Sequence, residues 1–328
     1  MTGTRLRVGV LGTADIARRK MATALRDTEG IELTAVASRR QHDAERFAAE
    51  FRCAAVEGYE ALLHRDDIDA VYIPLPVAMI ARWVDLALRR GKHVLAEKTV
   101  TASSRVARGL SRVADEHGRT LVANFAFLHH RRQRVVEELL ASGALGEIRL
   151  FRADFAFPPR DQEDIRYRPD LGGGALLDAG TYVLRAARWA LGPVPEVEAA
   201  SLATSGPLGV DVAGAVQLRS VTGVPAQLSF GFDHDYRCEY EIWGSRGRLR
   251  VERAFTMPAG QESTVWFTGA GQVEELPAAA DDQYARMTER FLAAVECAEI
   301  RGAELRTVEE HAQLLEAVTA AAGRQPCR

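Results

Sequence analysis

Lysine is nearly absent from this chain of 328 residues. Of its 42 basic residues, three are lysines, Lys20, Lys92 and Lys98, and the other 39 are arginines. A coding bias toward arginine explains this composition. Arginine would serve equally well at Lys20, on the outer part of the first predicted helix, and at Lys92, where a strand begins. Lys98 stands out because it follows a predicted buried strand.

Cysteine and long apolar runs are also scarce. The four cysteines, at 53, 238, 297 and 327, form no CxxC motif and no Cys/His cluster, which argues against structural zinc and a disulfide framework and fits a reducing cytoplasm. No apolar run approaches the ~20 residues that span a bilayer, and no signal segment precedes the first strand. A formal net charge of -3 offers no basic excess for nucleic acid or an anionic membrane. We therefore expect a cytoplasmic protein with no metal, nucleic-acid or membrane partner.

The length predicts two domains, at roughly 150 residues each. Residues 1–124 alternate between strand and helix patterns. Strands are expected at 7–11, 32–37, 70–73, 92–96 and 120–124, and helices at 15–26, 41–51, 78–90 and 103–117. This alternation predicts a parallel, doubly wound sheet, the Rossmann dinucleotide-binding fold.

Residues 125–328 follow a different pattern, dominated by period-2 segments separated by turns. Strands are expected at 148–157, 213–220, 226–232, 240–243, 248–253 and 264–268, and helices at 133–142, 281–299 and 308–323. The pattern indicates an α+β domain on a large, mostly antiparallel open sheet. A partner subunit could pack on this sheet, and the C-terminal helices could pack back on the first domain.

The first motif is a glycine turn at the end of the first strand. Gly12 opens a segment in which Ala14 and Ala17 stand at the second and third glycine positions of GxGxxG. A helix that begins here offers N–H groups and a partial positive charge to a pyrophosphate. The alternative is a plain strand–turn–helix connection.

The second motif, Ser38-Arg39-Arg40, follows the second strand. An NAD site usually has an acidic residue here for the ribose hydroxyls. A hydroxyl and two guanidiniums instead suit a 2′-phosphate, which favours NADP over NAD. The alternative is one more arginine pair in an arginine-rich chain.

The third motif, Glu97-Lys98, directly follows the predicted strand of residues 92–96. Doubly wound folds bind ligands at this edge of the sheet. A lysine there can hold a substrate oxygen and stabilise the charge that develops during hydride transfer. The alternative is a solvated lysine that closes a strand.

The fourth motif is a glycine-rich loop, 172–174, before an apolar helical stretch. Asp178 and Tyr182 are spaced i, i+4 and are expected to share one helical face. A phenol can act as general acid or base on a carbonyl/alcohol pair when a nearby ammonium lowers its pKa. The alternative is a core tyrosine with an aspartate that favours the helix dipole.

Together these motifs resemble the glucose–fructose oxidoreductase/inositol dehydrogenase (Gfo/Idh/MocA) family over almost the whole chain. Glu97-Lys98 and Asp178-x-Gly180-x-Tyr182 match its signatures, Glu-Lys-Pro and Asp-x-Gly-x-His/Tyr. Several segments are similar to one branch in particular, the NADPH-dependent C-3 ketoreductases of nucleotide-activated deoxysugar biosynthesis. These segments are 14–17, 37–40, 71–76, 124–130, 164–167 and the glycine-rich helix.

The resemblance implies reduction of the C-3 keto group of a dTDP-4-keto-2,6-dideoxyhexose, made by a 2,3-dehydratase, in deoxysugar and antibiotic glycoside biosynthesis. It also implies a homodimer or homotetramer through the C-terminal sheet. Lys98 would polarise the C-3 oxygen, Tyr182 would donate the proton and Asp178 would orient the sugar. Implied NADPH/NADP+ contacts are Gly12, Thr13, Ala14, Asp15, Ile16, Ala17, Ser38, Arg39, Arg40, Tyr59, Pro74, Leu75, Glu97, Lys98, Asn124 and Arg166. Implied nucleotide-sugar contacts are Lys98, Phe125, His129, Arg166, Tyr167, Asp178 and Tyr182.

Three residues depart from the family pattern. Ala14 replaces a glycine, and Ile80 stands about where the family commonly has a histidine. Thr99 replaces the proline after Glu-Lys, before which a cis peptide bond would be less costly.

Two further functions stay open. One is an NADP-dependent dehydrogenase of a free sugar or a trans-dihydrodiol, which the Asp/Tyr helix also resembles. The other, suggested by the three departures, is a cofactor-binding partner protein with little catalysis of its own.

Overall fold

The chain, seen in a computed structural model that describes residues 5–205 and 208–323, divides into two compact units. The first contains the chain up to Asn124 together with Tyr284–Glu309, and the second contains Phe125–Gln283 and the chain from Glu310 onward. The long helix α9, Ala298–Ala322, contributes residues to both units. Each unit is described in turn.

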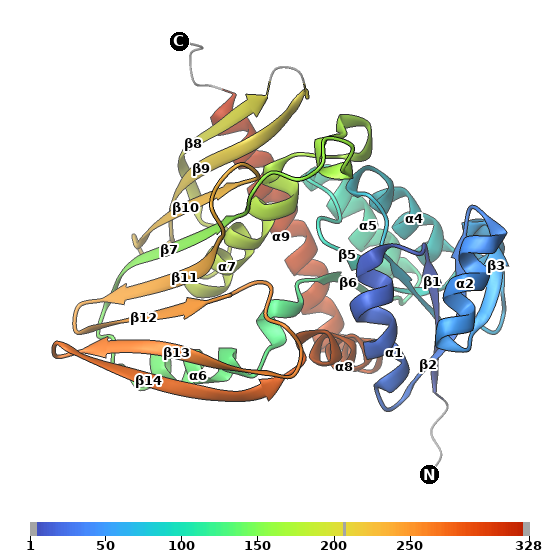
Figure 1. Cartoon of the computed structure of the whole chain (residues 1–328), viewed down its shortest axis with the longest axis horizontal. Helices are drawn as coiled ribbons and strands as arrows, with labels where there is room; N and C mark the ends of the chain where they lie inside the picture. Colours follow the sequence, from blue (N-terminus) through green and yellow to red (C-terminus); the bar gives the residue numbers. More distant parts are fainter. Residues whose placement is uncertain (1–4, 206–207, 324–328) are drawn as a thin grey trace. The chain divides into compact units, whose positions relative to one another are not determined.

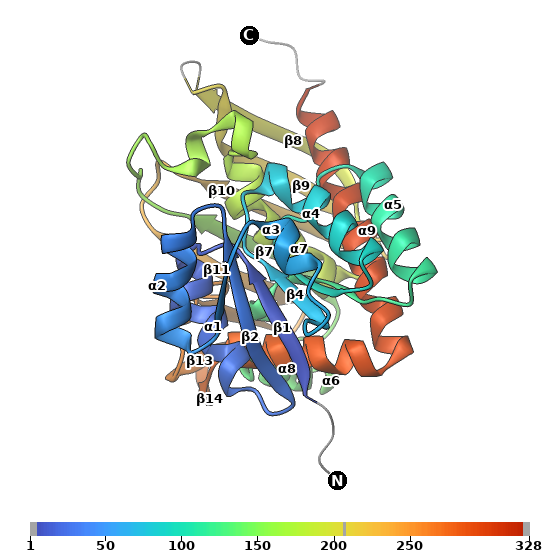
Figure 2. The same ribbon diagram turned by 90° about the vertical axis from the view of Figure 1, so that its right-hand side faces the viewer.

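The first unit is built on a six-stranded parallel sheet in the order β3-β2-β1-β4-β5-β6. The strands are β1 Leu6–Leu11, β2 Ile31–Ser38, β3 Ala54–Glu57, β4 Ala70–Ile73, β5 His93–Glu97 and β6 Leu121–Asn124. The central strands are buried on both faces, which explains their continuous apolar sequences. The strand order reverses between β1 and β4, where doubly wound sheets bind dinucleotides. Figure 2 shows β2, β1 and β4 side by side.

Helices connect these strands, as the alternation predicts. They are α1 Ala22–Asp27, α2 Gln41–Phe51, α3 Tyr59–Leu63, α4 Val77–Arg89 and α5 Ser104–Glu116, with a π-helical turn at Ala17–Met21 before α1. Helix α8, Gln283–Glu296, belongs to this unit despite its distance in sequence. Thr28 Oγ1 lies 2.5 Å from Thr288 Oγ1, and Thr120 Oγ1 donates to the Ala294 carbonyl at 3.1 Å.

The second unit contains an eight-stranded sheet in the order β14-β13-β12-β11-β7-β10-β9-β8. The strands are β7 Ile148–Ala156, β8 Glu196–Ser205, β9 Val210–Arg219, β10 Pro225–Gly231, β11 Arg237–Gly244, β12 Gly247–Glu252, β13 Gln261–Gly269 and β14 Gln272–Asp281. All neighbouring pairs are antiparallel except β7 and β10. Two helices, α6 Arg132–Ala141 and α7 Thr181–Leu191, pack on one face of this sheet, visible in Figure 1.

The two faces of this sheet differ in polarity. Phe151, Ala153 and Phe155 of β7 are buried toward the helices, whereas Arg152 between them is exposed on the other face. The expected fold, a Rossmann domain followed by a domain on a large, mostly antiparallel sheet, is therefore confirmed. Among the helices of residues 5–205 and 208–323, none combines the length and hydropathy needed to cross a bilayer.

Candidate active site

The predicted dinucleotide turn begins at Gly12, at the end of β1. Gly12 has a φ of 122°, and its N–H donates to the Ala37 carbonyl at 2.9 Å. A Cβ here would lie 3.1 Å from Cδ2 of Leu75 and 3.7 Å from the Pro74 carbonyl, so glycine is required by conformation and by space. Ala17 is fully buried where the helix packs, as expected for the third position of the fingerprint. Thr13, Ala14 and Ile16 lie between, half-buried, with Asp15 exposed.

The second motif lies at the end of β2. Ser38 is buried, and its carbonyl accepts a hydrogen bond from Gly58 N–H at 2.8 Å. Arg40 pairs with Asp43 at 2.9 Å. Arg39 is exposed beside the hydroxyl of Tyr59, whose pKa is raised by burial although Arg39 opposes the shift. In the part of the chain that the structure describes, Arg39 forms no ion pair, so its charge is available to an anion.

The Glu97 carboxylate links three adjacent strands. Its Oε1 accepts hydrogen bonds from the Tyr72 hydroxyl of β4 at 2.7 Å and from Asn124 Nδ2 of β6 at 2.6 Å. Burial raises the pKa of Glu97, while Tyr72, Lys98 and Asn124 act in the opposite direction. Lys98 follows immediately, half-buried, and the Lys98–Thr99 peptide bond is cis although residue 99 is not proline.

Asn124 provides a test of whether this edge of the sheet suits a bound cofactor. Its side chain is 4% exposed, and its Oδ1 has no hydrogen-bond partner among the described residues. Buried polar atoms are normally paired, so this acceptor suits a ligand that brings a donor. Together with the turn at Gly12, it shows that the residues present fit a nicotinamide dinucleotide.

Arg166 joins the glycine-rich helix to the preceding loop. Its Nε donates to Asp178 Oδ2 at 2.6 Å, and its Nη1 donates to Asp164 Oδ1 at 3.0 Å. Burial opposes the charge of Arg166, but the two carboxylates outweigh it and raise its pKa. Asp178 lies in a π-helical turn, Leu176–Gly180, rather than in the regular α-helix expected from the sequence.

The glycine loop is held by Asp211 of β9, a residue that no motif marked. Asp211 Oδ2 accepts the Leu176 N–H at 2.6 Å. A Cβ on Gly174 would lie 2.4 Å from Asp211 Oδ1, and one on Gly173 would lie 2.4 Å from the Arg166 carbonyl. The glycines therefore permit two close approaches that fix the start of the Asp178/Tyr182 segment. Burial raises the pKa of Asp211, and backbone N–H groups oppose the shift.

Tyr182 is the second residue of α7 and lies within an aromatic cluster. Its ring centroid lies 5.3 Å from that of Phe155, 5.7 Å from Phe255, 5.9 Å from Phe127 and 6.2 Å from Phe125. The side chain is nevertheless half-buried rather than enclosed. The ring packs in an aromatic cluster while part of the residue stays exposed, so the two interpretations of Tyr182 in the sequence are compatible.

The other expected contacts lie as follows. Tyr59 is buried with its ring edge against Trp83 at 5.1 Å, and Tyr167 is buried against Phe232 at 5.9 Å. Phe125 is buried, and His129 ends a 3-10 turn at Ala126–His129. Ile80, where the family commonly has histidine, is fully buried in α4 as a core residue.

Within each unit the structure thus brings predicted residues together: Glu97 with Asn124 in the first, and Arg166 with Asp178 in the second. Sequence reasoning missed three residues that hold these groups, Tyr72, Asp164 and Asp211. Tyr72 and Asp164 lie inside segments that resembled the branch, whereas Asp211 had no local signal because strand pairing brings it to the loop.

Comparison with known proteins places this geometry in a family. Residues 6–125 match the oxidoreductase family with an NAD-binding Rossmann fold, and residues 133–250 match the GFO/IDH/MocA C-terminal domain. A relative from Saccharopolyspora spinosa, named dTDP-3,4-didehydro-2,6-dideoxy-alpha-D-glucose 3-reductase, is 48% identical over 87% of this chain and 86% of its own length. A relative of the same name from Actinomadura kijaniata is also 48% identical, over 88% of this chain and 87% of its own.

A solved structure agrees with these relatives. KijD10, a 3-ketoreductase from Actinomadura kijaniata in complex with NADP and TDP-benzene, superimposes with a TM-score of 0.93 at 45% identity, covering 97% of this chain and 98% of that one. Similar structures exist of KijD10 with one lysine or one tyrosine replaced. The chain belongs to the GFO/IDH/MocA family of oxidoreductases, and its predicted resemblance to the nucleotide-sugar C-3 ketoreductases is confirmed.

Proposed function

We propose that this chain is an NADPH-dependent reductase of the C-3 keto group of a dTDP-4-keto-2,6-dideoxyhexose. The observation that carries the proposal is the full-length likeness, in sequence and fold, to 3-reductases of one such sugar nucleotide. The substrate would be the product of a sugar-nucleotide 2,3-dehydratase. The reaction then belongs to deoxysugar and antibiotic glycoside biosynthesis in the cytoplasm.

The chain's own residues supply the binding and acid–base chemistry. When bound, NADPH supplies the hydride that the ketone carbon accepts. Lys98 holds the ketone oxygen, and its ammonium stabilises the alkoxide that develops there. Tyr182 gives its proton to this oxygen, so that ketone, NADPH and one proton become alcohol and NADP+. Asp178, fixed by Arg166, orients the sugar through a hydroxyl.

Two features of the first unit support NADP as the cofactor. The Gly12 turn allows the pyrophosphate to approach the backbone at a helix start. Ser38, Arg39 and Arg40 offer a hydroxyl and two cations to a 2′-phosphate, where an NAD site has an acidic residue. In this proposal residues 1–124 bind the dinucleotide, and residues 125–328 supply most sugar contacts.

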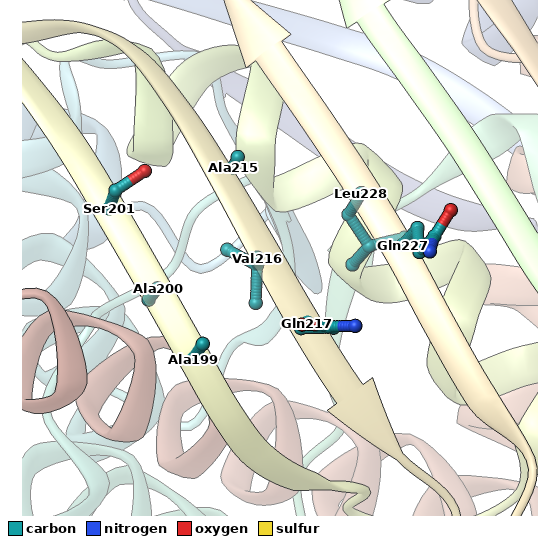
Figure 3. Close-up of a pocket in the computed structure, with 8 residues that line it drawn as sticks. All are labelled: Ala199, Ala200, Ser201, Ala215, Val216, Gln217, Gln227 and Leu228. Atoms are coloured by element: carbon teal, nitrogen blue, oxygen red, sulfur yellow. The ribbon is translucent and has the colours of Figure 1, made fainter.

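We also propose that a second copy of the chain packs on the exposed face of the large sheet. Trp243 is 51% and Val273 64% exposed on that face, two large apolar side chains that a second copy would cover. Residues of β8, β9 and β10, among them the small Ala199, Ser201 and Ala215, line a shallow hollow of about 310 Å³, shown in Figure 3. Sedimentation of the wild type should show a dimer or tetramer. A Trp243→Glu variant should shift it toward the monomer.

The test of function uses purified protein, NADPH and the keto sugar nucleotide generated by a 2,3-dehydratase. We expect loss of the reduced-nicotinamide absorbance and formation of the C-3 alcohol. Calorimetry should show binding of dTDP, which a dehydrogenase of free sugars or dihydrodiols would not bind. Tight NADPH binding without turnover of the keto sugar would instead indicate a partner protein with little catalysis.

A further inference from the structure

We propose that Glu97 is a positioning residue that fixes the side-chain amide of Asn124. In this orientation Asn124 accepts a hydrogen bond through Oδ1 from the carboxamide N–H of the nicotinamide. The proposal rests on NADPH binding, as argued above, but is independent of the sugar substrate.

The chemistry of the two side chains determines the orientation. A carboxyl oxygen that carries no proton only accepts hydrogen bonds, whereas an amide has one donating and one accepting end. Glu97 Oε1 lies 2.6 Å from Asn124, so Asn124 must turn its NH2 group toward the carboxylate. The Tyr72 hydroxyl donates to the same oxygen at 2.7 Å, so Oε1 is the acceptor in both contacts.

The consequence is an acceptor that nothing in the described chain satisfies. Asn124 is 4% exposed, and its Oδ1 has no partner in residues 5–205 and 208–323. Such an atom is unfavourable until a donor reaches it. Asn124 is also the single asparagine in the 328 residues, so this position keeps a residue type that the chain otherwise omits.

The position of Asn124 in the sheet indicates which ligand group would donate to its Oδ1. Glu97 and Asn124 are paired in register at the C-terminal ends of β5 and β6, the edge where doubly wound sheets bind dinucleotides. Lys98, which we propose to hold the oxygen of the reacting ketone, is the next residue after Glu97. The reacting end of the cofactor therefore belongs here, and its carboxamide NH2 is the hydrogen-bond donor that the nicotinamide ring itself carries.

The test compares NADP+ with its 3-acetylpyridine analogue, in which a methyl replaces the carboxamide NH2. The wild type should bind NADP+ about tenfold more tightly than the analogue, the effect of one buried hydrogen bond. Asn124→Leu should weaken NADP+ binding alone and abolish this preference. Glu97→Gln should reduce the preference. The glutamine amide can accept from the Asn124 NH2 group or donate to Asn124 Oδ1, so it no longer fixes the orientation of Asn124. Tyr72→Phe leaves the Glu97–Asn124 bond in place and should retain the preference.

Each outcome has a distinct meaning. A preference that survives in Asn124→Leu overturns the contact to the carboxamide, and one that survives in Glu97→Gln overturns the positioning role. Asn124→Ala provides the same comparison if the leucine variant does not fold. Failure of the wild type to bind either dinucleotide would contradict the proposed cofactor itself, whereas inactivity on the sugar would leave these binding results unaffected.

Discussion

Nε of Arg166 donates a hydrogen bond to Oδ2 of Asp178 at 2.6 Å, across twelve residues of sequence. The aspartate expected to contact the sugar is thus held by a guanidinium that is itself held by Asp164. Asp178 can face a substrate only in the orientation that this pair allows. The Asp178 carboxylate is therefore oriented before any ligand binds, which favours tight recognition of the sugar that we propose it contacts.

Arg166→Met should lower kcat/KM for the keto sugar nucleotide about tenfold or more, because it leaves the half-buried Asp178 without its charged partner. The dissociation constant of NADPH distinguishes a loss of sugar binding from a loss of cofactor binding. Arg168→Met is the matched control, since the Arg168–Asp170 pair is exposed at both ends. Equal effects of the two variants would contradict the role of Arg166.

Arg39→Met should weaken NADPH binding about tenfold, because the exposed guanidinium can donate two parallel hydrogen bonds to the 2′-phosphate. NADH lacks this phosphate, so its binding should be unchanged. Arg40→Met should have the smaller effect, since Asp43 already neutralises Arg40. Titration of the protein fluorescence with NADPH and with NADH gives the dissociation constant of each dinucleotide for each variant. The reverse order of the two variants would show that Arg40 leaves Asp43 to bind the cofactor.

Lys92→Met should reduce the free energy of unfolding by about 2–3 kcal/mol, measured in urea at pH 7. Lys92 is buried, and its Nζ donates to the carbonyls of Arg65 at 2.8 Å and Ile68 at 2.7 Å. The methionine variant leaves both carbonyls without this donor. Lys20→Met, at a half-buried position on the first helix, should change stability by less than about 0.5 kcal/mol. A Lys92→Met protein with the same free energy of unfolding as the wild type would contradict the structural role of Lys92.

His93 should make the protein sensitive to acid. Burial, Arg119 and Arg301 lower its pKa to about 4, with Asp69 opposing. Because the unfolded chain takes up this proton first, stability is complete above about pH 6.5 and falls as the pH drops toward 4, by at most about 3 kcal/mol. His93→Asn keeps an acceptor for the Thr120 N–H, which His93 Nδ1 binds at 3.1 Å. This variant should show a flatter pH dependence of the free energy of unfolding than the wild type.

The fold was predictable because periodicity marks buried elements. The three strands that the sequence did not indicate, β3, β8 and β14, are all at sheet edges. Edge strands are partly solvated and tolerate residues that interrupt the pattern, such as the alanines of β8 and Pro277 of β14. Helix α9 also begins at Ala298, ten residues before the expected start at 308.

The site was predictable where a motif carries the chemistry and not where tertiary structure supplies it. Gly12, Lys98 and Asp178 lie in local patterns. Asp211 reaches the glycine loop only because β9 lies beside that loop. Lys92 corrects an expectation from composition. The compact Lys92 ammonium donates to two backbone carbonyls from a buried position, and a planar guanidinium has a different donor geometry.

The most direct test of the account is the rate of NADPH oxidation by wild type and Lys98→Arg with the 3-keto sugar nucleotide. If the Lys98 ammonium stabilises the developing alkoxide, the variant should lose at least about a hundredfold in kcat. Its NADPH dissociation constant should stay within about twofold, because the charge is kept and the fold is unchanged. Lys20→Arg should match the wild type in both measurements. A Lys98→Arg enzyme that turns over at the wild-type rate would contradict the proposed mechanism.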